Sequence, residues 1–311
     1  MARTADVVVE NFRPGVMDRL GIGYAALQSI NPRIIYASIT AFGATGPIAQ
    51  NPGMDLILQA TGGMMGLSGF PGDPPVKAAG TVADISSGIY AAYAIALALY
   101  HRAQTGVGQR IDLTMLDAVI SLLADISTAY LNTGHEYEKF GNGHPDLVPY
   151  QAFKGNDGYF IVACLTNAFF KRLCQGLKRE DLLADPKFAN NTVRCRHREE
   201  IVGILQEIFL TNTCDHWIKL CTDFDVPSCR VNGLNELFAM EQLKAIGSVV
   251  EWEHPQHGKF RTMNVPFHMS ATPGALRIPP PGLAEHTDEV LRTLGKSDDE
   301  IAALRAAGAC G

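Results

Sequence analysis

The stretch ADVVVENFRPGVMDRLGIGYAALQSINPRIIYASI (residues 5–39) decides the fold class of this 311-residue chain. Its two ends, residues 5–11 and 33–39, are short runs rich in β-branched residues, which is typical of buried parallel strands. The residues between them have a helical pattern, so the stretch predicts one strand–helix–strand unit with a right-handed crossover. Further along, QRIDLTML (109–116) predicts another strand, and residues 84–102 predict a long helix. We therefore expect an α/β fold with a parallel sheet.

Composition places the chain among globular proteins and argues against two classes of partner. Apolar residues make up 47% of the sequence, which is enough for a substantial core. The formal charge of −6 provides no basic footprint for nucleic acid or for an anionic membrane surface. The one basic cluster, RCRHREE (194–200), is interpreted as a solvated helix face. We expect neither a nucleic-acid partner nor a membrane partner.

The cysteines and the first residues bear on the compartment. The chain has seven cysteines, none in a C-x-x-C pair, and an odd count without a regular framework predicts reduced thiols. The N-terminus lacks a basic region followed by an apolar one, so no signal peptide is predicted. The longest apolar run, residues 89–100, has about half the length that spans a bilayer. We expect a cytoplasmic protein, or one in the mitochondrial matrix if a lost N-terminal segment carried a targeting peptide.

Changes of pattern along the chain predict three parts. We expect a Rossmann-like large domain over 1–145, a smaller α+β domain over 146–240, and a return segment over 241–311 that packs on the large domain. The glycine- and proline-marked stretch GNGHPDLVPY (141–150) is the expected boundary between the first two. An open α/β domain rarely begins with its first strand at residue 5. We therefore expect strands on the N-terminal side to be missing or supplied by another subunit.

Several common motifs are absent from the sequence. No G-x-G-x-x-G follows a strand, no Walker A sequence occurs, and no G-x-S-x-G nucleophile elbow is present. The two histidines of HPQH (254–257) have no third ligand nearby, so this stretch is interpreted as a solvated loop. The sequence therefore predicts no metal site, no dinucleotide fingerprint and no α/β-hydrolase elbow.

One acidic residue stands apart, because GTVADISSGIY (80–90) places Asp84 among apolar neighbours just before the long helix. The first interpretation is a helix N-cap, whose side chain accepts an amide hydrogen of the first turn. The second is a nucleophile, since a carboxylate at a helix start near the carboxyl edge of a sheet is within reach of substrate. The residues alone leave both interpretations open.

An ordered set of motifs carries a resemblance to a known family. The blocks are VVVENFRPGVMDRLGIGY, RIIYASITAFGATGP, PGMDLILQATGG, VADISSG and GVGQRIDLTMLDA. Together with GNGHPDLVPYQAFKGNDGYF and the closing PPPGLAEHTDEVL, they make the chain similar to the family III CoA-transferases. This family includes formyl-CoA and carnitine CoA-transferases and the α-methylacyl-CoA racemases. The chain most resembles the succinate–hydroxymethylglutarate (glutarate) CoA-transferases, and it lacks the N-terminal segment that family members carry.

The resemblance implies a chemistry for Asp84. In the family's transferases the matching aspartate is the nucleophile, and the reaction passes through a mixed aspartyl anhydride and an aspartyl-CoA thioester. Both intermediates hydrolyse, so the chemistry needs a site that excludes water. The resemblance also implies an interlocked homodimer, acyl-CoA as the source of coenzyme A, and no metal.

The block ENFRPG (10–15) matches the part of the family that contacts the nucleotide of CoA. Arginine suits phosphate because its planar donors bind two oxygens at once. The alternative is a helix-start turn with solvated arginines. The resemblance implies four CoA-binding residues in the large domain: Asn11, Phe12, Arg13 and Arg19.

A second loop matches the glycine-rich segment that covers the active site in the family. GNGHP (141–145) carries only Gly141 and Gly143, fewer than the run of glycines in formyl-CoA transferases. Backbone N–H groups there would stabilise an oxyanion, and His144 would contact a substrate carboxylate. The alternative is an ordinary interdomain turn.

The stretch PGMD (52–55) separates the branches of the family. The racemases have a histidine where Met54 stands, and Met54 cannot carry the proton that racemisation needs. Asp55 either orients the site or caps the helix that follows it. Gln59 lies one helical turn further on the same face, with the same two interpretations.

The function that we expect is transfer of CoA from an acyl-CoA to a free carboxylic acid. The acids are expected to be dicarboxylates such as succinate and glutarate, with Asp84 as the nucleophile. Two alternatives remain at this stage. One is an acyl-CoA racemase or isomerase of the same superfamily, and the other is a non-catalytic, truncated CoA-binding dimer partner.

Overall fold

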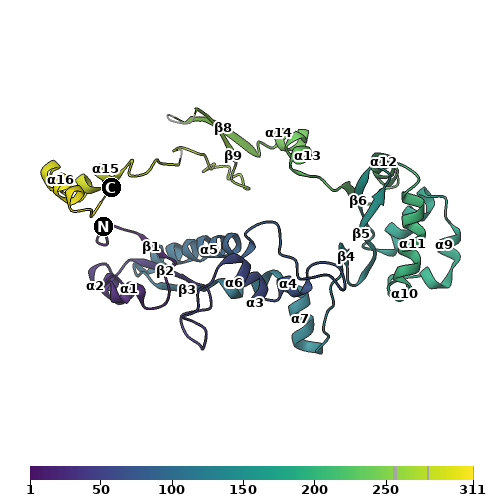
Figure 1. The fold of residues 1–311 in the computed structure, drawn as a ribbon, viewed down its shortest axis with the longest axis horizontal. Helices are drawn as coiled ribbons and strands as arrows, with labels where there is room; N and C mark the ends of the chain where they lie inside the picture. Colours follow the sequence, from purple (N-terminus) through teal and green to yellow (C-terminus); the bar gives the residue numbers. More distant parts are fainter. Residues whose placement is uncertain (255–257, 279, 311) are drawn as a thin grey trace. The chain divides into compact units, whose positions relative to one another are not determined.

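The computed structural model describes residues 1–254, 258–278 and 280–310 of the chain, and side chains of that part except His254. The chain divides into two compact units, Met1–Arg230 and Val231–Gly311. Figure 1 shows the elements of both units. The first unit contains a parallel and an antiparallel sheet. The expectation of a mixed α/β chain with a parallel sheet is therefore confirmed, while the division into three domains stays a prediction.

The parallel sheet has three strands in the order β1-β2-β3. The strands are β1 (Val7–Glu10), β2 (Ile35–Thr40) and β3 (Arg110–Thr114). β1 and β2 are parallel neighbours, as the opening stretch of the sequence predicts. The single helix expected between them is instead two, α1 (Val16–Arg19) and α2 (Tyr24–Ile30). The break follows from Gly21, whose φ of 74° lies in the left-handed region.

Helices after β2 and around β3 complete this part of the unit. They are α3 (Asp55–Thr61), α4 (Met64–Leu67), α5 (Val82–Thr105), α6 (Met115–Leu122) and α7 (Ala124–Thr133). The stretch DAVISLLADISTAYL (117–131) predicts a single helix, but two helices form there and the chain bends by 87° between them. A small core of Leu58, Ala83, Met115 and Val119 joins α3, α5 and α6. This core fixes the start of α5 against α3.

Helix α5 is longer than the apolar run that marks it in the sequence. Its 24 residues make it long and apolar enough to cross a membrane, by length and composition alone, and 28% of its most apolar window is buried. The apolar run at residues 89–100 is therefore only the middle part of a helix that begins at Val82 and continues to Thr105. The helix ends at Gly106, whose φ of 78° gives a left-handed C-cap.

The antiparallel sheet has four strands in the order β4-β5-β6-β7. They are β4 (Gly143–His144), β5 (Leu147–Gly155), β6 (Gly158–Ala163) and β7 (Ser228–Arg230). The helices around it are α8 (Asn167–Gly176), α9 (Asp181–Ala184), α10 (Asn191–Arg196), α11 (Arg198–Phe209) and α12 (Cys214–Asp223), with a 3₁₀ turn at Pro186–Phe188. Phe153, Phe160, Phe209 and Trp217 stack edge to face in its core. These aromatic contacts give this part the larger core of the unit.

The interpretation of residues 194–200 as a solvated helix face is wrong for Arg194. This side chain is fully buried, and it donates to the carbonyl oxygens of Val148 and Phe188 and to Oδ1 of Asn167. Its guanidinium also lies 4.2 Å from the ring centre of Phe170. Burial lowers the pKa of Arg194, but the three acceptors offset the cost of burying its charge. The exposed Arg196 on the same helix matches the original interpretation.

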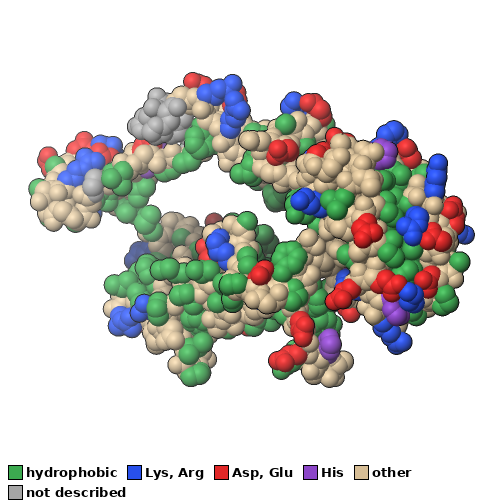
Figure 2. Space-filling view, turned by 45° about the vertical axis from the view of Figure 1, so that its right-hand side comes forward, with side chains coloured by type: hydrophobic (Ala, Val, Ile, Leu, Met, Phe, Trp, Pro, Cys, Tyr) green, Lys and Arg blue, Asp and Glu red, His purple; other side chains and the backbone are tan. Residues whose placement is uncertain are grey.

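The second unit contains two short helices, a two-stranded hairpin and two C-terminal helices. They are α13 (Leu234–Ala239), α14 (Glu241–Ala245), β8 (Val249–His254), β9 (Gly258–Met263), α15 (Thr287–Thr293) and α16 (Asp298–Ala306). The stretch HGKFRTMNVPF (257–267) predicts a strand, and β9 confirms it over its described residues. The HPQH stretch lies outside the described side chains. Apolar side chains lie at the surface in both units (Figure 2), and all seven cysteines are free thiols.

Candidate active site

A cavity of about 690 Å³ opens at the carboxyl ends of the three parallel strands. Asn11, Ala41 and Met115, which line it, each come directly after one of these strands. Asn11 Nδ2 donates to the carbonyl oxygen of Ile39 at 2.7 Å, which holds the chain leaving β1 against β2. Open α/β sheets bind ligands at this edge. The cavity is therefore our candidate active site.

Asp84 lines this cavity from the first turn of α5. The N-cap of α5 is Thr81, and Asp84 is the third residue of the helix, so the interpretation of Asp84 as the N-cap is wrong. Within the described part of the chain, no hydrogen bond or ion pair involves its carboxylate, and the side chain is exposed. The expected shielding of Asp84 by apolar neighbours is thus not found in the single chain. The positive end of the α5 dipole still favours a negative charge at this position.

A different carboxylate satisfies the start of α5. Asp55 Oδ1 accepts the backbone N–H of Ala83 at 2.7 Å, across 28 residues of sequence. Asp55 is the first residue of α3, whose N-cap is Met54, and it makes no cap bond to its own helix. The interpretation of Asp55 as a cap for the following helix is therefore wrong. The physical reason is that α3 and α5 share a core, which brings Asp55 against the α5 terminus.

Gln59 lies behind the cavity and not in its lining. Its side chain is fully buried on α3, and its Nε2 donates to Asp55 Oδ2 at 2.7 Å. The expectation that Gln59 and Asp55 share a helix face is confirmed by this bond. Gln59 thus contacts Asp55 directly, on the side away from Ala83.

Two cations line the cavity together with Asp84. Arg13 comes from the loop after β1, and Lys77 from the loop before α5. Sequence reasoning missed Lys77, although it is the one basic residue in the stretch from 68 to 83. Phe12 and Arg19, which the family resemblance links to CoA, do not line this cavity. Cations at its rim suit the phosphates of a nucleotide-bearing substrate.

The loop at residues 141–145 lines a separate cavity of about 490 Å³. Gly141 has a φ of 65°, and a Cβ there would lie 2.5 Å from the ring of Phe70, so this position needs glycine. Its N–H donates to the carbonyl oxygen of Gly69 at 2.9 Å. The loop is therefore packed against residues 69–70.

His144 in this loop has a defined hydrogen-bond state. Its Nδ1 accepts the backbone N–H of Asp146 at 3.1 Å, so the neutral ring carries its hydrogen on Nε2. Arg198 donates to the carbonyl oxygens of His144 and Pro145 at 2.9 and 2.6 Å. Sequence reasoning missed this role of Arg198, because the basic cluster reads as a solvated face. These hydrogen bonds fix the loop, and they leave Nε2–H of His144 as its one ring N–H donor.

The structure therefore sorts the predicted site residues into groups. The cavity at the sheet edge brings together four of them: Asn11, Arg13, Asp55 and Asp84. The second cavity holds Gly141, Gly143 and His144, and the two cavities share no lining residue. One chain by itself thus does not place the loop and Asp84 in the same cavity.

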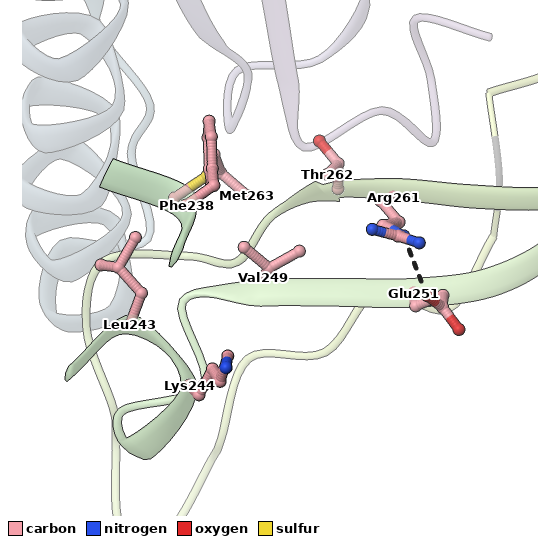
Figure 3. A pocket seen from close by; sticks show the side chains of 9 residues that line it. Phe238, Leu243, Lys244, Val249, Glu251, Arg261, Thr262 and Met263 are labelled. Carbon is pink, nitrogen blue, oxygen red and sulfur yellow. Dashed lines mark ion pairs between the residues drawn. The ribbon is translucent and has the colours of Figure 1, made fainter. Parts of the chain in front are cut away.

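A third cavity lies in the unit Val231–Gly311, where α13, α14 and the β8–β9 hairpin line it. Figure 3 shows the apolar side chains Phe238, Leu243 and Met263 around it, with Arg261 beside Glu251. Arg261 Nε lies 3.0 Å from Glu251 Oε2, so this cation is already paired. The one carboxylate that lines this cavity, Glu251, is paired with both Lys259 and Arg261 and is not free to attack a substrate. It is therefore a weaker candidate for acyl transfer than the cavity at the sheet edge.

The described residues bring no cluster of metal-ligating side chains to this site. Across residues 1–254, 258–278 and 280–310, no group of three or more His, Cys, Asp and Glu side chains is placed to hold a metal ion. The cavity at the sheet edge offers two carboxylates, of which only Asp84 lacks a partner in the described part of the chain, and two cations. Such a set can bind an anionic ester or thioester and attack its carbonyl carbon.

Comparison with known proteins identifies the class of this fold and site. The family model described as CoA-transferase family III matches residues 1–287. A crystal structure of a CAIB/BAIF family protein from Brucella suis matches with a TM-score of 0.81 and 36% sequence identity, covering 94% of this chain and 76% of that one. The chain belongs to CoA-transferase family III. The expected family and the enzyme class, a CoA-transferase, are both confirmed.

Individual relatives are similar over nearly the whole chain. An acyl-CoA transferase of Fusarium pseudograminearum is 37% identical over 99% of this chain and 68% of its own length. The human succinyl-CoA:glutarate CoA-transferase is 35% identical over 99% of this chain and 70% of its own length. The succinate–glutarate CoA-transferase of Agrobacterium fabrum is 37% identical, covering 94% and 74%. The branch that the sequence most resembles is thus represented among the relatives.

Proposed function

We propose that this chain transfers CoA from an acyl-CoA to a dicarboxylic acid such as succinate or glutarate, with Asp84 as the nucleophile. One observation carries the proposal: the Asp84 carboxylate lies in the cavity at the carboxyl edge of the parallel sheet with no partner in the described part of the chain. The names of two relatives, which are succinate–glutarate CoA-transferases, support the choice of acids.

The reaction balances with Asp84 alone as the protein's covalent group. A carboxylate oxygen of Asp84 attacks the thioester carbonyl carbon, the C–S bond breaks, and CoA leaves as the thiolate. The thiolate then attacks the Asp84 carbonyl of the mixed anhydride, which releases the donor acid as its carboxylate. The acceptor carboxylate attacks the resulting aspartyl thioester and expels the thiolate. A final attack of the thiolate on the acceptor carbonyl gives the new acyl-CoA and restores Asp84.

The residues around Asp84 have defined tasks in this proposal. Arg13 and Lys77 bind phosphate groups of CoA at the rim of the cavity, and Asn11 holds the loop that carries Arg13. Phe12 and Arg19 stay proposed CoA contacts through the family resemblance. The ring Nε2–H of His144 and the backbone N–H groups of Gly141 and Gly143 are proposed to bind the substrate carboxylate or the oxyanion.

Racemisation is disfavoured by the same cavity. Met54, which occupies the position of the racemase histidine, lines the cavity and is 70% exposed. A thioether cannot donate or accept a proton at the α-carbon. A non-catalytic role is disfavoured by the open access to Asp84.

We also propose an interlocked homodimer with a Rossmann-like large domain, in the cytoplasm. An apolar stripe at four-residue spacing on α5 supports a covering partner: Ile85, Ile89, Tyr93 and Leu97 are each more than half exposed. A second copy would also give the loop at 141–145 a route to the Asp84 cavity of its partner.

The free cysteines support the proposed location in a reducing compartment, the cytoplasm.

The test is a covalent trap. The protein is mixed with succinyl-, glutaryl-, acetyl- or formyl-CoA, quenched with hydroxylamine, and mapped by intact mass and peptide mass spectrometry. A hydroxamate on Asp84 is expected, strongest with succinyl- or glutaryl-CoA and absent in Asp84→Asn. A folded, dimeric protein that no acyl-CoA labels at Asp84 would reject the assignment.

A further inference from the structure

Gln59 is a polar side chain in a place where an apolar one is normal. It lies on α3 next to the core residue Leu58, and both are fully buried. A buried amide lowers stability unless both of its ends are hydrogen-bonded. Its presence therefore needs an explanation from its partners.

Both ends of the Gln59 amide are bonded. Oε1 accepts the N–H of Ala78 at 2.9 Å, and Nε2 donates to the carbonyl oxygen of Gly80 at 3.4 Å. These two residues belong to the segment that leads into α5. The same Nε2 donates to Asp55 Oδ2, while Asp55 Oδ1 accepts the N–H of Ala83. One continuous network thus runs from residues 78–80 through Gln59 and Asp55 to the residue before Asp84.

The network permits only one orientation of the amide. If the Gln59 amide flipped, its oxygen would face the Asp55 carboxylate and its NH₂ group would face the N–H of Ala78. Both contacts would then be repulsive. In this orientation Gln59 holds the Asp55 carboxylate between its own Nε2 and the N–H of Ala83, and it fixes the path of residues 78–80 at the same time.

We propose that Gln59 is a positioning residue for the transfer reaction. By holding Asp55 and residues 78–80, it sets the first turn of α5, so that the Asp84 carboxylate points into the cavity and is not drawn to the free amides of its own helix. The proposal rests on the proposed role of Asp84 as the nucleophile. Gln59 touches no substrate and acts only through Asp55 and the backbone.

The experiment reverses the donor and acceptor of the central bond. Asp55→Asn places an NH₂ group against Gln59 Nε2, and Gln59→Glu places a carboxylate against Asp55. The double variant Asp55→Asn/Gln59→Glu restores one donor and one acceptor in the central bond and keeps acceptors for Ala78 and Ala83, and it loses only the long 3.4 Å bond to the Gly80 carbonyl oxygen. Gln28→Glu, an exposed change on α2, is the matched control.

The readouts are kcat, KM for succinyl-CoA, the rate of hydroxamate formation at Asp84, and the thermal midpoint. Each single variant is expected to lower kcat and the labelling rate about 10- to 100-fold, because small misplacements of a reacting group have effects of this size. KM is expected to change less than about two-fold, since binding is not the step at fault. The double variant should recover to within about three-fold of the unmodified protein.

Several outcomes overturn the proposal. Three results would assign Gln59 a purely structural role. The first is a loss of kcat that follows the loss of thermal midpoint. The others are a folded double variant that does not recover kcat, and single variants that do not fold. Failure of the proposed function is a separate result, because the unmodified protein would then show no hydroxamate at Asp84. Normal labelling in both folded single variants would reject the positioning role while leaving the role of Asp84 intact.

Discussion

Arg194 and Asp84 are two charges in the same unit with opposite surroundings. Arg194 is fully buried, and its nitrogens donate to Val148, Phe188 and Asn167. Asp84 is exposed in a cavity, and its carboxylate has no partner in the described part of the chain. A charge whose partners all come from the protein holds segments of the fold together. A charge without protein partners remains available to a substrate.

The apolar residues around the two charges also differ: those near Arg194 are buried, and many of those near Asp84 are exposed. Arg194 lies beside the large core that includes Phe153, Phe160 and Phe209. The parallel sheet has only small buried clusters, and α5 shows its apolar stripe to the surface. The region around Arg194 therefore satisfies its own side chains. The region around Asp84 offers both its charge and its apolar surface to other molecules.

The largest expected effect comes from removing the unpartnered charge. Asp84→Asn should lower the rate of CoA transfer from succinyl-CoA to glutarate at least about 10³-fold, because loss of a covalent nucleophile has effects of this order or larger. The thermal midpoint should fall only slightly, since no hydrogen bond or ion pair is lost and only the interaction with the α5 dipole is removed. The measurement is the initial rate by chromatography of the acyl-CoAs, with Asp73→Asn on an exposed loop as the control. If Asp84→Asn kept more than about a tenth of the activity, Asp84 would not be the nucleophile, and its lack of protein partners would have no catalytic meaning.

Removing the fully partnered charge should affect folding and leave the reaction unchanged. Arg194→Met is expected to lower the free energy of unfolding by about 3–5 kcal/mol, because it leaves three buried acceptors without donors. The rate per folded molecule should stay within about two-fold of normal. Urea denaturation followed by circular dichroism measures the loss, and Arg196→Met on the exposed side of the same helix is the control. A loss no larger than that of the control would mean that Arg194 contributes little to stability.

The sequence predicts the parallel strands well, because an apolar β-branched run is a local signal. Partners distant in sequence are not predictable in this way. The acceptors of Arg194 come from positions 6, 27 and 46 residues away. The cap of α5 comes from Asp55, 28 residues before Ala83. The sequence therefore identifies Asp84 as a candidate but cannot decide between cap and nucleophile, since that decision depends on a contact between two helices.

The same limit explains the other missed residues. Lys77 is a single cation in a turn-rich segment, and only the folded loop places it in the same cavity as Arg13. Arg198 lies in a basic cluster, and only the fold shows that it holds the carbonyl oxygens of His144 and Pro145. Each of these residues has an ordinary local pattern. Their roles arise from tertiary contacts that no local signal encodes.

The two cations beside Asp84 test whether its cavity binds the anionic substrate. Arg13→Gln and Lys77→Gln should each raise KM for succinyl-CoA about 3- to 10-fold with little change in kcat, because each removes one contact to a phosphate. The increase should shrink as salt is raised, since salt screens exposed charges. Steady-state kinetics at two ionic strengths measure this, with the exposed Arg3→Gln as the control. A KM that stays unchanged at low salt would remove these residues from the CoA site.

Asp157 separates the effect of partners from the effect of burial. It lies at the surface, yet Oδ1 accepts the N–H of Cys214 and Oδ2 accepts an N–H of Arg230, each at 2.7 Å. The amide hydrogen bond, followed by the Arg230 contact, holds the pKa of Asp157 well below its usual range. If protein partners, as at Arg194, are what make a charge stabilising, then Asp157 should stabilise the fold although it is not buried.

The smallest expected effect is the pH dependence of that stabilisation. Because the folded pKa lies below the unfolded value of about 3.9, the contribution of Asp157 is present above the unfolded pKa and is lost as pH falls through the folded one. The stability difference between the unmodified protein and Asp157→Asn should be constant from about pH 5 to 7 and shrink below about pH 4. Urea denaturation across this range measures it, with Asp223→Asn on α12 as the control for loss of a surface carboxylate. A difference that stays constant down to about pH 3 would show that the Asp157 charge contributes nothing, and that burial, not partnering, separates Arg194 from Asp84.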